Sequence, residues 1–419
     1  MGLSKDLPPL SRRPDECRVC GTRLLRTVLD LGNQPLANRL EEHPYAPEPR
    51  IPLVICRCEA CGTIQLTETV LPEVLFRKYV WVTGTSGVAQ KYSRLFCERV
   101  SKRAGQGPRF VIEVASNDGT FLLPFAAQGD RVLGVDPAEN IAALARGRGI
   151  PTEAKFFGRQ VAHSLVSRSG PADVVFARNV IPHVADAQDF VAGVAECLKP
   201  SGIGVVEFHR GDIILKELHY DSIYHEHLCY HTLDSMTRLL EGCGLHPFDV
   251  ETSPISGGSF VVYAAKTKIS PSKNLIQQMT LEADLGVGGA PAWDHFAGQV
   301  VRHRDLLRNL VLDFKAKGLR LAGYGASARS STLLNYCGLT RDHLDAIADR
   351  AELKHGKFAP GTGIPILPPK NVLANNPDVL LLLAWNFQDE ILRQLREEYH
   401  WRGRIISPLP GDPQVITVS

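Results

Sequence analysis

The chain has 419 residues, a formal net charge of +2 and 44% hydrophobic residues. This length exceeds one ordinary hydrophobic core, so we expect two or three domains. The small net charge argues against a nucleic-acid-binding protein, because such proteins usually carry a strong basic excess. The longest apolar run, 379–385, has the length of a strand, and residues 1–16 lack the apolar core of a signal peptide. We therefore expect a cytoplasmic protein without a membrane partner.

Cysteines cluster near the start of the chain, where two Cys-x-x-Cys-Gly units occur. Such a turn presents two thiolates to a tetrahedral zinc ion, and the glycine that follows it suits a positive φ angle. The pattern predicts structural Zn²⁺ in a domain over residues 1–75, with the ligands Cys17, Cys20, Cys58 and Cys61. Cys56 is interpreted as a spectator. The alternatives are four reduced structural thiols, or a zinc ribbon that binds nucleic acid.

The second unit, residues 76–275, alternates predicted strands with predicted helices. Helical spacing of apolar residues predicts a helix over 86–103. Buried strands are expected in FVIEV, RVLGV, ADVVFAR, GIGVVEFH and SFVVYAA, with helices between them. Strands and helices that alternate at this spacing indicate a parallel, doubly wound α/β sheet.

The third unit, residues 276–419, begins with a long helical stretch that is interrupted at 286–291. A strand, a Gly/Ser turn and a helix follow in RLAGYGASARSSTLLNYCG. Three more strands are predicted in LDAIADR, VLLLLAW and RIISPLP. This order predicts a second, smaller α/β domain of Rossmann-like type.

A polar turn follows the first strand of the second unit, where a doubly wound sheet binds nucleotide-type ligands. Ala115 and Gly119 are small enough for the backbone to approach a ligand. The second strand ends at Asp136, whose carboxylate can accept hydrogen bonds from ribose hydroxyls, and Pro137 is placed to touch an adenine ring. Glu113 opens the turn. These residues are therefore candidates for binding a cofactor.

The same turn lacks the G-x-G-x-x-G pattern that holds a pyrophosphate, which disfavours a dinucleotide. S-adenosylmethionine has no phosphate, and its amino acid end needs polar partners. Ser116, Asn117 and Asp118 can supply them. The sequence thus favours a class I methyltransferase domain over an ordinary strand and turn with a charged edge.

Two polar clusters follow later strands of the same sheet. One contains Asn179 and His183, and the other is Tyr-His-Glu-His at 224–227. Methylation of a carbon requires a base that removes a proton next to a carbonyl group and a donor that stabilises the enolate oxygen. A histidine in 225–227 is the candidate base, Glu226 can orient it or raise its basicity, and Tyr224 and Asn179 are candidate donors.

Structural roles for these histidines remain open. Residues 209–231 contain five histidines, and most histidines are hydrogen-bonded structural residues. His225 and His227 have the spacing of a metal pair, but no obvious carboxylate set completes it. His183 could simply cap the turn that follows it.

Five motifs occur in one order over nearly the whole chain. They are the paired Cys-x-x-Cys units, EVASNDGT (113–120), YHEH (224–227), YGASAR (324–329) and PGTGIPI (360–366). In these motifs the chain resembles the sugar C-3′-methyltransferases of antibiotic deoxysugar biosynthesis, which act on dTDP-linked 4-keto-deoxysugars. The resemblance implies S-adenosylmethionine as cofactor, structural zinc and a nucleotide-sugar as the small-molecule partner.

The resemblance also implies residue roles. Tyr224, Glu226 and His227 would be catalytic, with His227 removing the C-3 proton that the C-4 keto group makes acidic. The enolate would then attack the methyl group in line. Further residues would face the sugar (Asn179, His183, Tyr79), line the cofactor (Glu113, Asn117, Gly119, Asp136) or bind the substrate (Gly325, Ser327, Arg329, Lys357).

The chain departs from the family pattern at three positions. Arg329 stands where a lysine is commoner, which keeps the charge but replaces a point cation with a planar fork. Ser256 and Val261 stand where the family more often has a histidine and an arginine. These two changes bear on the substrate and its phosphate contacts more than on the reaction type.

Three other functions compete with this one. The chain could methylate a carbon of a non-sugar keto substrate. It could be an NAD-dependent nucleotide-sugar oxidoreductase, although Gly323 and Gly325 are not followed by the third glycine of the fingerprint. It could also be a zinc-ribbon binding protein with a degenerate methyltransferase domain. We expect a monomer in each case.

Overall fold

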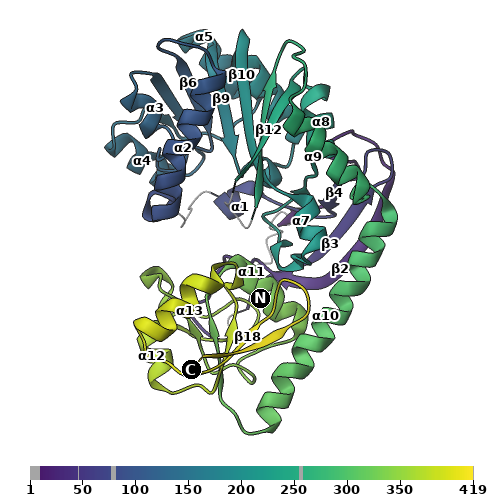
Figure 1. The fold of residues 1–419 in the computed structure, drawn as a ribbon, viewed down its shortest axis with the longest axis vertical. Helices are drawn as coiled ribbons and strands as arrows, with labels where there is room; N and C mark the ends of the chain where they lie inside the picture. Colours follow the sequence, from purple (N-terminus) through teal and green to yellow (C-terminus); the bar gives the residue numbers. More distant parts are fainter. Residues whose placement is uncertain (1–9, 46, 77–81, 254–257, 419) are drawn as a thin grey trace, which may run out of the picture.

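The computed structural model describes residues 10–45, 47–76, 82–253 and 258–418. It contains two α/β units, one above the other in Figure 1. Along one side they are connected by the long helix α10 (Ala290–Ala316) and by two strands of the cysteine-rich segment, β2 (Leu25–Pro35) and β3 (Arg50–Cys58). The domain boundaries at 75 and 275 stay predictions.

The cysteine-rich segment forms a four-stranded antiparallel sheet in the order β11-β4-β3-β2. Strand β4 (Ile64–Leu66) belongs to the segment, but β11 (Cys229–Tyr230) comes from the central unit. The short pair β1–β5 and a helical turn lie beside this sheet: β1 (Ser11–Arg12), β5 (Thr69–Val70) and α1 (Pro72–Phe76). The sheet is therefore completed only when the central unit folds against it.

The central unit is built on a seven-stranded sheet in the order β12-β13-β10-β9-β6-β7-β8. Every pairing is parallel except those of β13, which runs antiparallel to both neighbours. The predicted doubly wound sheet is thus confirmed. The strands are β6 (Phe110–Val114), β7 (Arg131–Val135), β8 (Thr152–Glu153), β9 (Ala172–Arg178), β10 (Leu198–His209), β12 (His246–Ser253) and β13 (Ser259–Ala265).

Helices cover both faces of this sheet, and each face has its own apolar core. On one face Phe176 of β9 packs between Phe96 and Phe125, at ring-centroid distances of 5.1 and 5.6 Å. Three helices contribute to this face: α2 (Gly87–Arg103), α3 (Leu123–Ala127) and α4 (Glu139–Gly147). The other face carries α5 (Arg159–Ser169), α6 (Ala187–Cys197), α8 (Leu233–Gly242) and α9 (Lys273–Asp284).

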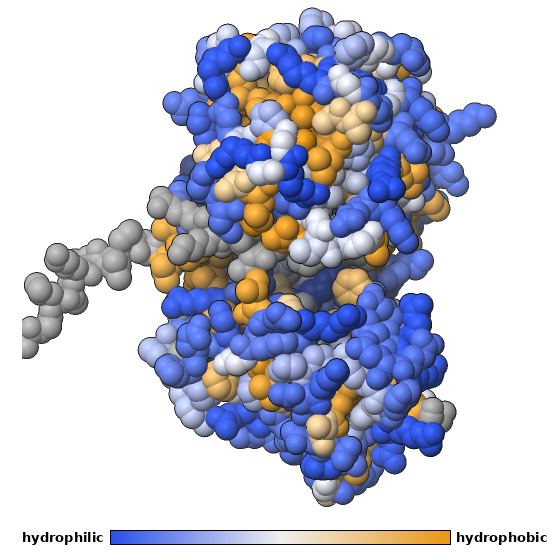
Figure 2. Space-filling model, turned by 90° about the vertical axis from the view of Figure 1, so that its left-hand side faces the viewer, coloured by the Kyte–Doolittle hydropathy of each residue, from blue (hydrophilic) through white to orange (hydrophobic). Residues whose placement is uncertain are grey.

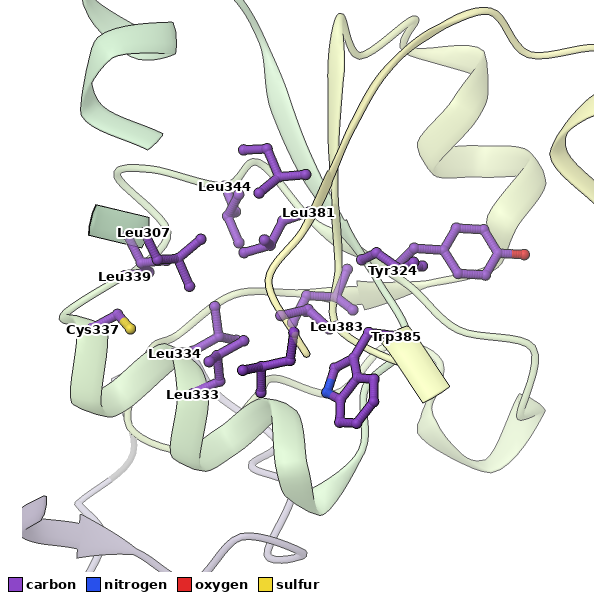
Figure 3. Close-up of a cluster of buried hydrophobic side chains, with 14 of the residues drawn as sticks. Leu307, Tyr324, Leu333, Leu334, Cys337, Leu339, Leu344, Leu381, Leu383 and Trp385 are labelled. Atoms are coloured by element: carbon purple, nitrogen blue, oxygen red, sulfur yellow. The ribbon is translucent and has the colours of Figure 1, made fainter. Parts of the chain in front are cut away.

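The C-terminal unit has a six-stranded sheet in the order β16-β15-β14-β17-β18-β19, parallel except for β19. Figure 3 shows Leu333 and Leu334 of helix α11, which follows the first strand of this sheet, facing Leu381 and Leu383. Trp385 lies at the edge of the cluster. The elements are β14 (Leu321–Tyr324), α11 (Ala328–Cys337), β15 (Ile347–Ala348), β16 (Ile366–Leu367), α12 (Pro369–Ala374), β17 (Val379–Leu382), α13 (Gln388–Glu397), β18 (Gly403–Ser407) and β19 (Gln414–Val418). The predicted smaller α/β fold is confirmed.

All three units share one apolar core, which holds leucines of β2 and β3, Trp293 of α10 and most of the C-terminal sheet. Buried polar contacts cross the same boundary. The Tyr220 hydroxyl lies 3.0 Å from His303 Nδ1 of α10, and the Trp385 indole N–H donates to Asp221 at 2.7 Å. Hence the residues that follow α7 (Gly211–Lys216) are held by the C-terminal unit. Across the described residues, none of the helices is long and apolar enough to span a bilayer.

Candidate functional site

The four predicted zinc ligands come together in the cysteine-rich segment, which we call the zinc module. Their sulfur atoms all lie within 4.8 Å of one another, and the Cys17–Cys61 and Cys20–Cys58 pairs are each 3.6 Å apart. Tetrahedral Zn–S bonds of about 2.3 Å require sulfur separations of about 3.8 Å, so the cluster fits zinc. Hydrogen bonds from Cys17 and then from Thr63 lower the pKa of Cys61 to about 4, which already favours a thiolate. Cys56 lies outside the cluster, as expected.

The polar turn after β6 has an unusual backbone. Ala115, Asn117 and Gly119 all have positive φ angles, of 57°, 49° and 76°. Asn179, which follows the neighbouring strand β9, also has a φ of 49°. Left-handed non-glycine residues are costly and gather at functional sites. The two turns lie at the carboxyl ends of adjacent parallel strands, as a cofactor site in this fold requires.

Asp136 connects the ends of β6 and β7. Its carboxylate accepts the backbone N–H groups of Asn117 and Ala138, both at 2.9 Å, and it is 7% exposed. Burial raises its pKa, while these two hydrogen bonds lower it. Because each carboxylate oxygen can accept more than one hydrogen bond, the side chain can still receive ribose hydroxyls. The half-buried Pro137 follows it directly.

Asp118 supports the turn from within the protein. It pairs with Arg148 at 2.5 Å and accepts the N–H of Gly84 at 3.1 Å. The Ser116 hydroxyl is buried and has no hydrogen-bond partner among the described residues, and a Cβ atom on Gly134 would clash with it. The expected contact of both side chains with the amino acid end of the cofactor stays a prediction. Asn117 accepts the N–H of Thr83 at 2.8 Å.

Glu113 is buried inside the sheet rather than at the surface of the turn. Burial raises its pKa well above the usual value, although the nearby Arg178 opposes this shift. Arg178 itself donates to Glu207 at 2.6 Å. Burial thus favours the neutral form of the Glu113 carboxyl group, and its placement next to the cofactor is a proposal.

His227 and Tyr224 form a hydrogen-bonded pair. His227 Nδ1 lies 2.8 Å from the carbonyl oxygen of Ser222, which can only accept, so Nδ1 carries the hydrogen. Nε2 therefore accepts from the Tyr224 hydroxyl, at 2.8 Å. Burial lowers the pKa of His227 well below its usual value, followed by the effects of His183 and Arg329. The result is a neutral imidazole with a lone pair on Nε2.

His183 lies beside this pair, with its ring centroid 4.9 Å from that of His227. Its Nδ1 donates to the carbonyl oxygen of Glu226 at 2.6 Å, and burial lowers its pKa to about 4. The backbone N–H of Asn179 donates to the carbonyl oxygen of Glu207 at 2.7 Å. The structure thus brings the two predicted polar clusters together. Tyr79 lies outside the described residues.

The other members of the 224–227 segment face the zinc module. His225 Nε2 donates to the carbonyl oxygen of Ile51 at 3.1 Å, so it anchors the segment to β3. The Glu226 carboxylate accepts from Asn38 at 2.7 Å instead of from a histidine. Our expectation that this carboxylate orients a histidine is therefore wrong. Burial raises the pKa of Glu226 to about 7.

The C-terminal unit brings Arg329 to this region. Its guanidinium lies 5.6 Å from the ring of Trp385 and 4.0 Å from Asp221. The charge of Arg329 lowers the pKa values of His209 and His219, after burial, as it does for His227. Figure 2 shows a recess between the two α/β units. Arg329 and the imidazoles thus belong to one region between these units.

The remaining predicted substrate residues have structural contacts. Ser327 caps α11 by accepting the N–H of Ser330 at 3.2 Å. Gly325 has a φ of 97°, and a Cβ atom there would lie 2.4 Å from Ala384. Lys357 pairs with Glu42 of the N-terminal module at 3.5 Å, apart from Arg329. Their contacts with a substrate stay predictions.

Sequence reasoning missed four residues of this region: His209, His219, Trp385 and Asn38. His209 and His219 were counted among five histidines, but nothing in the pattern separated them from structural ones. Their rings are stacked with centroids 6.1 Å apart, and the His219 ring centroid lies 4.7 Å from the tilted ring of Trp385. Both are buried and, among the described residues, His209 Nε2 has no hydrogen-bond partner.

Replacement of the exposed zinc ligand Cys20 tests the zinc site. We expect Cys20→Ser to lose most of the bound zinc and to lower the melting temperature, because zinc-binding energy is folding energy for such a module. Metal analysis and thermal melts of the purified proteins measure both effects. Cys243→Ser, at a cysteine outside the cluster, is the matched control. Full zinc content in Cys20→Ser would contradict this assignment.

Known proteins match the chain over its full length. Three family models match in order: a zinc binding domain (17–76), a methyltransferase domain (88–248) and a C-methyltransferase C-terminal domain (254–410). The chain is 35% identical to the C-methyltransferase NovU of Streptomyces niveus, over 96% of this chain and 97% of the relative. A ubiquinone biosynthesis O-methyltransferase of Dinoroseobacter shibae is 26% identical to the chain. The match covers 39% of this chain and 69% of the relative.

The full-length match confirms the family recognised from the five motifs and leaves the oxidoreductase and binding-protein alternatives without support. The chain belongs to the S-adenosylmethionine-dependent C-methyltransferases, in which a structural zinc module precedes the methyltransferase domain and a C-methyltransferase C-terminal domain follows it.

Proposed function

We propose that the chain methylates C-3 of a dTDP-linked 4-keto-deoxysugar. The observation that carries this proposal is the grouping of one arginine with neutral, buried imidazoles between the two α/β units. A base of this kind suits abstraction of a proton next to a keto group, and an arginine fork suits a diphosphate. A nucleotide-linked keto sugar combines both chemical features in one molecule.

His227 acts as the base. Its Nδ1–H is held by Ser222, so Nε2 is the atom that receives the C-3 proton. The electron pair of the broken C–H bond moves into a C-3–C-4 double bond, and negative charge develops on the C-4 oxygen. Burial keeps the imidazole unprotonated before the substrate arrives, because it disfavours the charged form.

Tyr224 has a second role in this scheme. In the structure its hydroxyl donates to His227 Nε2, which must be vacated before the C-3 proton can arrive. We propose that the hydroxyl turns toward the C-4 oxygen when the substrate binds and stabilises the enolate there. Asn179 and His183, which lie at the neighbouring strand end, are proposed as further contacts to the sugar. Donors aimed at the developing charge are usually a large part of catalysis.

The cofactor side of the site is the turn after β6. S-adenosylmethionine, when bound, supplies the electrophilic methyl group that the C-3 carbanion attacks. Asn117, Gly119 and Ala115 form the turn beneath it, and Asp136 and Pro137 stand at the end of the next strand. In this proposal the buried Glu113 keeps the floor of the site uncharged.

Replacement of the proposed base, His227, should lower turnover without changing the affinity for the cofactor. We expect His227→Asn to lower kcat by about 10²-fold or more, since general base catalysis contributes that much, while S-adenosylmethionine affinity stays within about twofold. Turnover assays with a dTDP-4-keto-deoxysugar and calorimetric titration of the cofactor measure the two quantities. His163→Asn, at an exposed histidine on α5, is the matched control. Near-normal turnover in His227→Asn would move the base to another residue.

Arg329 should act on the nucleotide part of the substrate. We expect Arg329→Met to raise KM for the nucleotide-sugar, and Kd for free dTDP, by about tenfold or more, with a smaller effect on kcat. Arg329→Lys keeps the charge and should lose less. Steady-state kinetics and dTDP titration give these values. Unchanged dTDP binding in Arg329→Met would favour a keto substrate without a nucleotide.

A further inference from the structure

The zinc module holds the catalytic segment at several adjacent residues. His225 donates to Ile51 in β3, and the carbonyl oxygen of Leu228 accepts the N–H of Leu66 in β4 at 2.9 Å. Cys229 and Tyr230 then continue as β11, which pairs with β4. Apart from the His225 ring, only main-chain atoms take part in these contacts. The contacts fix the path of the segment, but they do not involve the side chains that the proposed function assigns to the chemistry.

Asn38 is different, because it reaches a side chain of that segment. Its amide nitrogen donates to Glu226 Oε1 at 2.7 Å, across 188 residues of sequence. Glu226 is 6% exposed, whereas Asn38 is itself exposed. Among the described residues no second partner of the Glu226 carboxylate is seen, and Oε2 is not among the buried unpartnered atoms. One oxygen is therefore occupied by Asn38, and the other remains accessible.

The surroundings of Glu226 give this single hydrogen bond a large effect. Desolvation raises the pKa of Glu226, and the bond from Asn38 is the one opposing cause. The titratable groups next to it are His183, His225 and His227, and burial lowers the pKa of each. Neutral imidazoles do not stabilise a carboxylate by charge. A donor to the ionised form is therefore the interaction that opposes the effect of burial on the pKa of Glu226.

We infer that Asn38 of the zinc module is a positioning residue of the methyltransferase reaction, which orients Glu226 and favours its carboxylate form, so that its second oxygen can accept a hydroxyl or amino hydrogen of the substrate. The inference rests on the proposed function for the identity of the substrate. The contact itself does not depend on it. The zinc module then has a direct part in the active site besides its structural one.

Two substitutions at Asn38 test this inference in the full-length protein. Asn38→Ala removes the donor, so the pKa of Glu226 should rise above its value of about 7. Asn38→Asp places a like charge beside the carboxylate and should raise that pKa further. Difference infrared spectra of the carboxyl stretch, assigned with Glu226→Gln, follow this titration without a substrate. Asn33→Ala, at an exposed asparagine of β2, is the matched control.

Kinetics supply the second measurement. At pH 7 we expect Asn38→Ala to lower kcat by about tenfold, with zinc content and S-adenosylmethionine affinity unchanged. Because a raised pKa leaves less ionised Glu226 at a given pH, the activity should recover as the pH rises. A purely structural defect would not recover in this way.

The two measurements also separate the inference from the proposed function. A Glu226 titration that is the same in the wild type, Asn38→Ala and Asn38→Asp overturns the inference, as does a kcat profile that keeps its wild-type shape. A wild-type protein that fails to methylate the keto sugar overturns the proposed substrate. The infrared titration then still decides whether Asn38 controls Glu226.

Discussion

Burial of ionisable side chains is the constraint on which this site depends. A buried imidazole keeps one tautomer and one orientation only if its N–H has a fixed acceptor. The structure provides main-chain carbonyls for this purpose: Ser222 for His227, Glu226 for His183 and Ile51 for His225. Because main-chain carbonyls do not titrate in the working pH range, the ring nitrogen that can receive a proton is defined by the fold.

This constraint explains why three units are needed for one reaction. The carbonyl that holds His225 belongs to the zinc module, and the arginine that faces the imidazoles belongs to the C-terminal unit. The zinc cysteines pack against the core of the methyltransferase sheet, while the strands of the same module share a core with the C-terminal unit. The module thus lies between the two α/β units, and the segment that contains the proposed base passes through this junction.

The sequence predicts the central sheet well because its strands are long, buried runs with a clear pattern, such as β9 and β10. Strands β8 and β16 have only two residues each and depend on pairing with neighbours, so no local pattern marks them. The zinc ligands were predictable because their spacing alone defines the chemistry. The family motifs supplied His227 and Tyr224 as candidates, and the structure adds their hydrogen bond.

Contacts between distant residues could not be predicted. The bond from Asn38 to Glu226 joins two units, and nothing near Asn38 in the sequence marks it. The supporting role of Asp118 depends on Arg148, which two helices and a strand separate from it. His225 and His227 look equivalent in sequence, but their rings face different units. Only the hydrogen-bond partners in the structure distinguish the two rings.

The position of the transferred methyl group tests the account most directly. Incubation of the protein with S-adenosylmethionine labelled with ¹³C in its methyl group and a dTDP-4-keto-deoxysugar, followed by ¹³C NMR, shows which atom carries the label. The account predicts a methyl carbon bonded to C-3, with carbon–carbon coupling to the ring in a ¹³C-labelled sugar. A methoxy signal, which means transfer to oxygen, would contradict methylation at C-3.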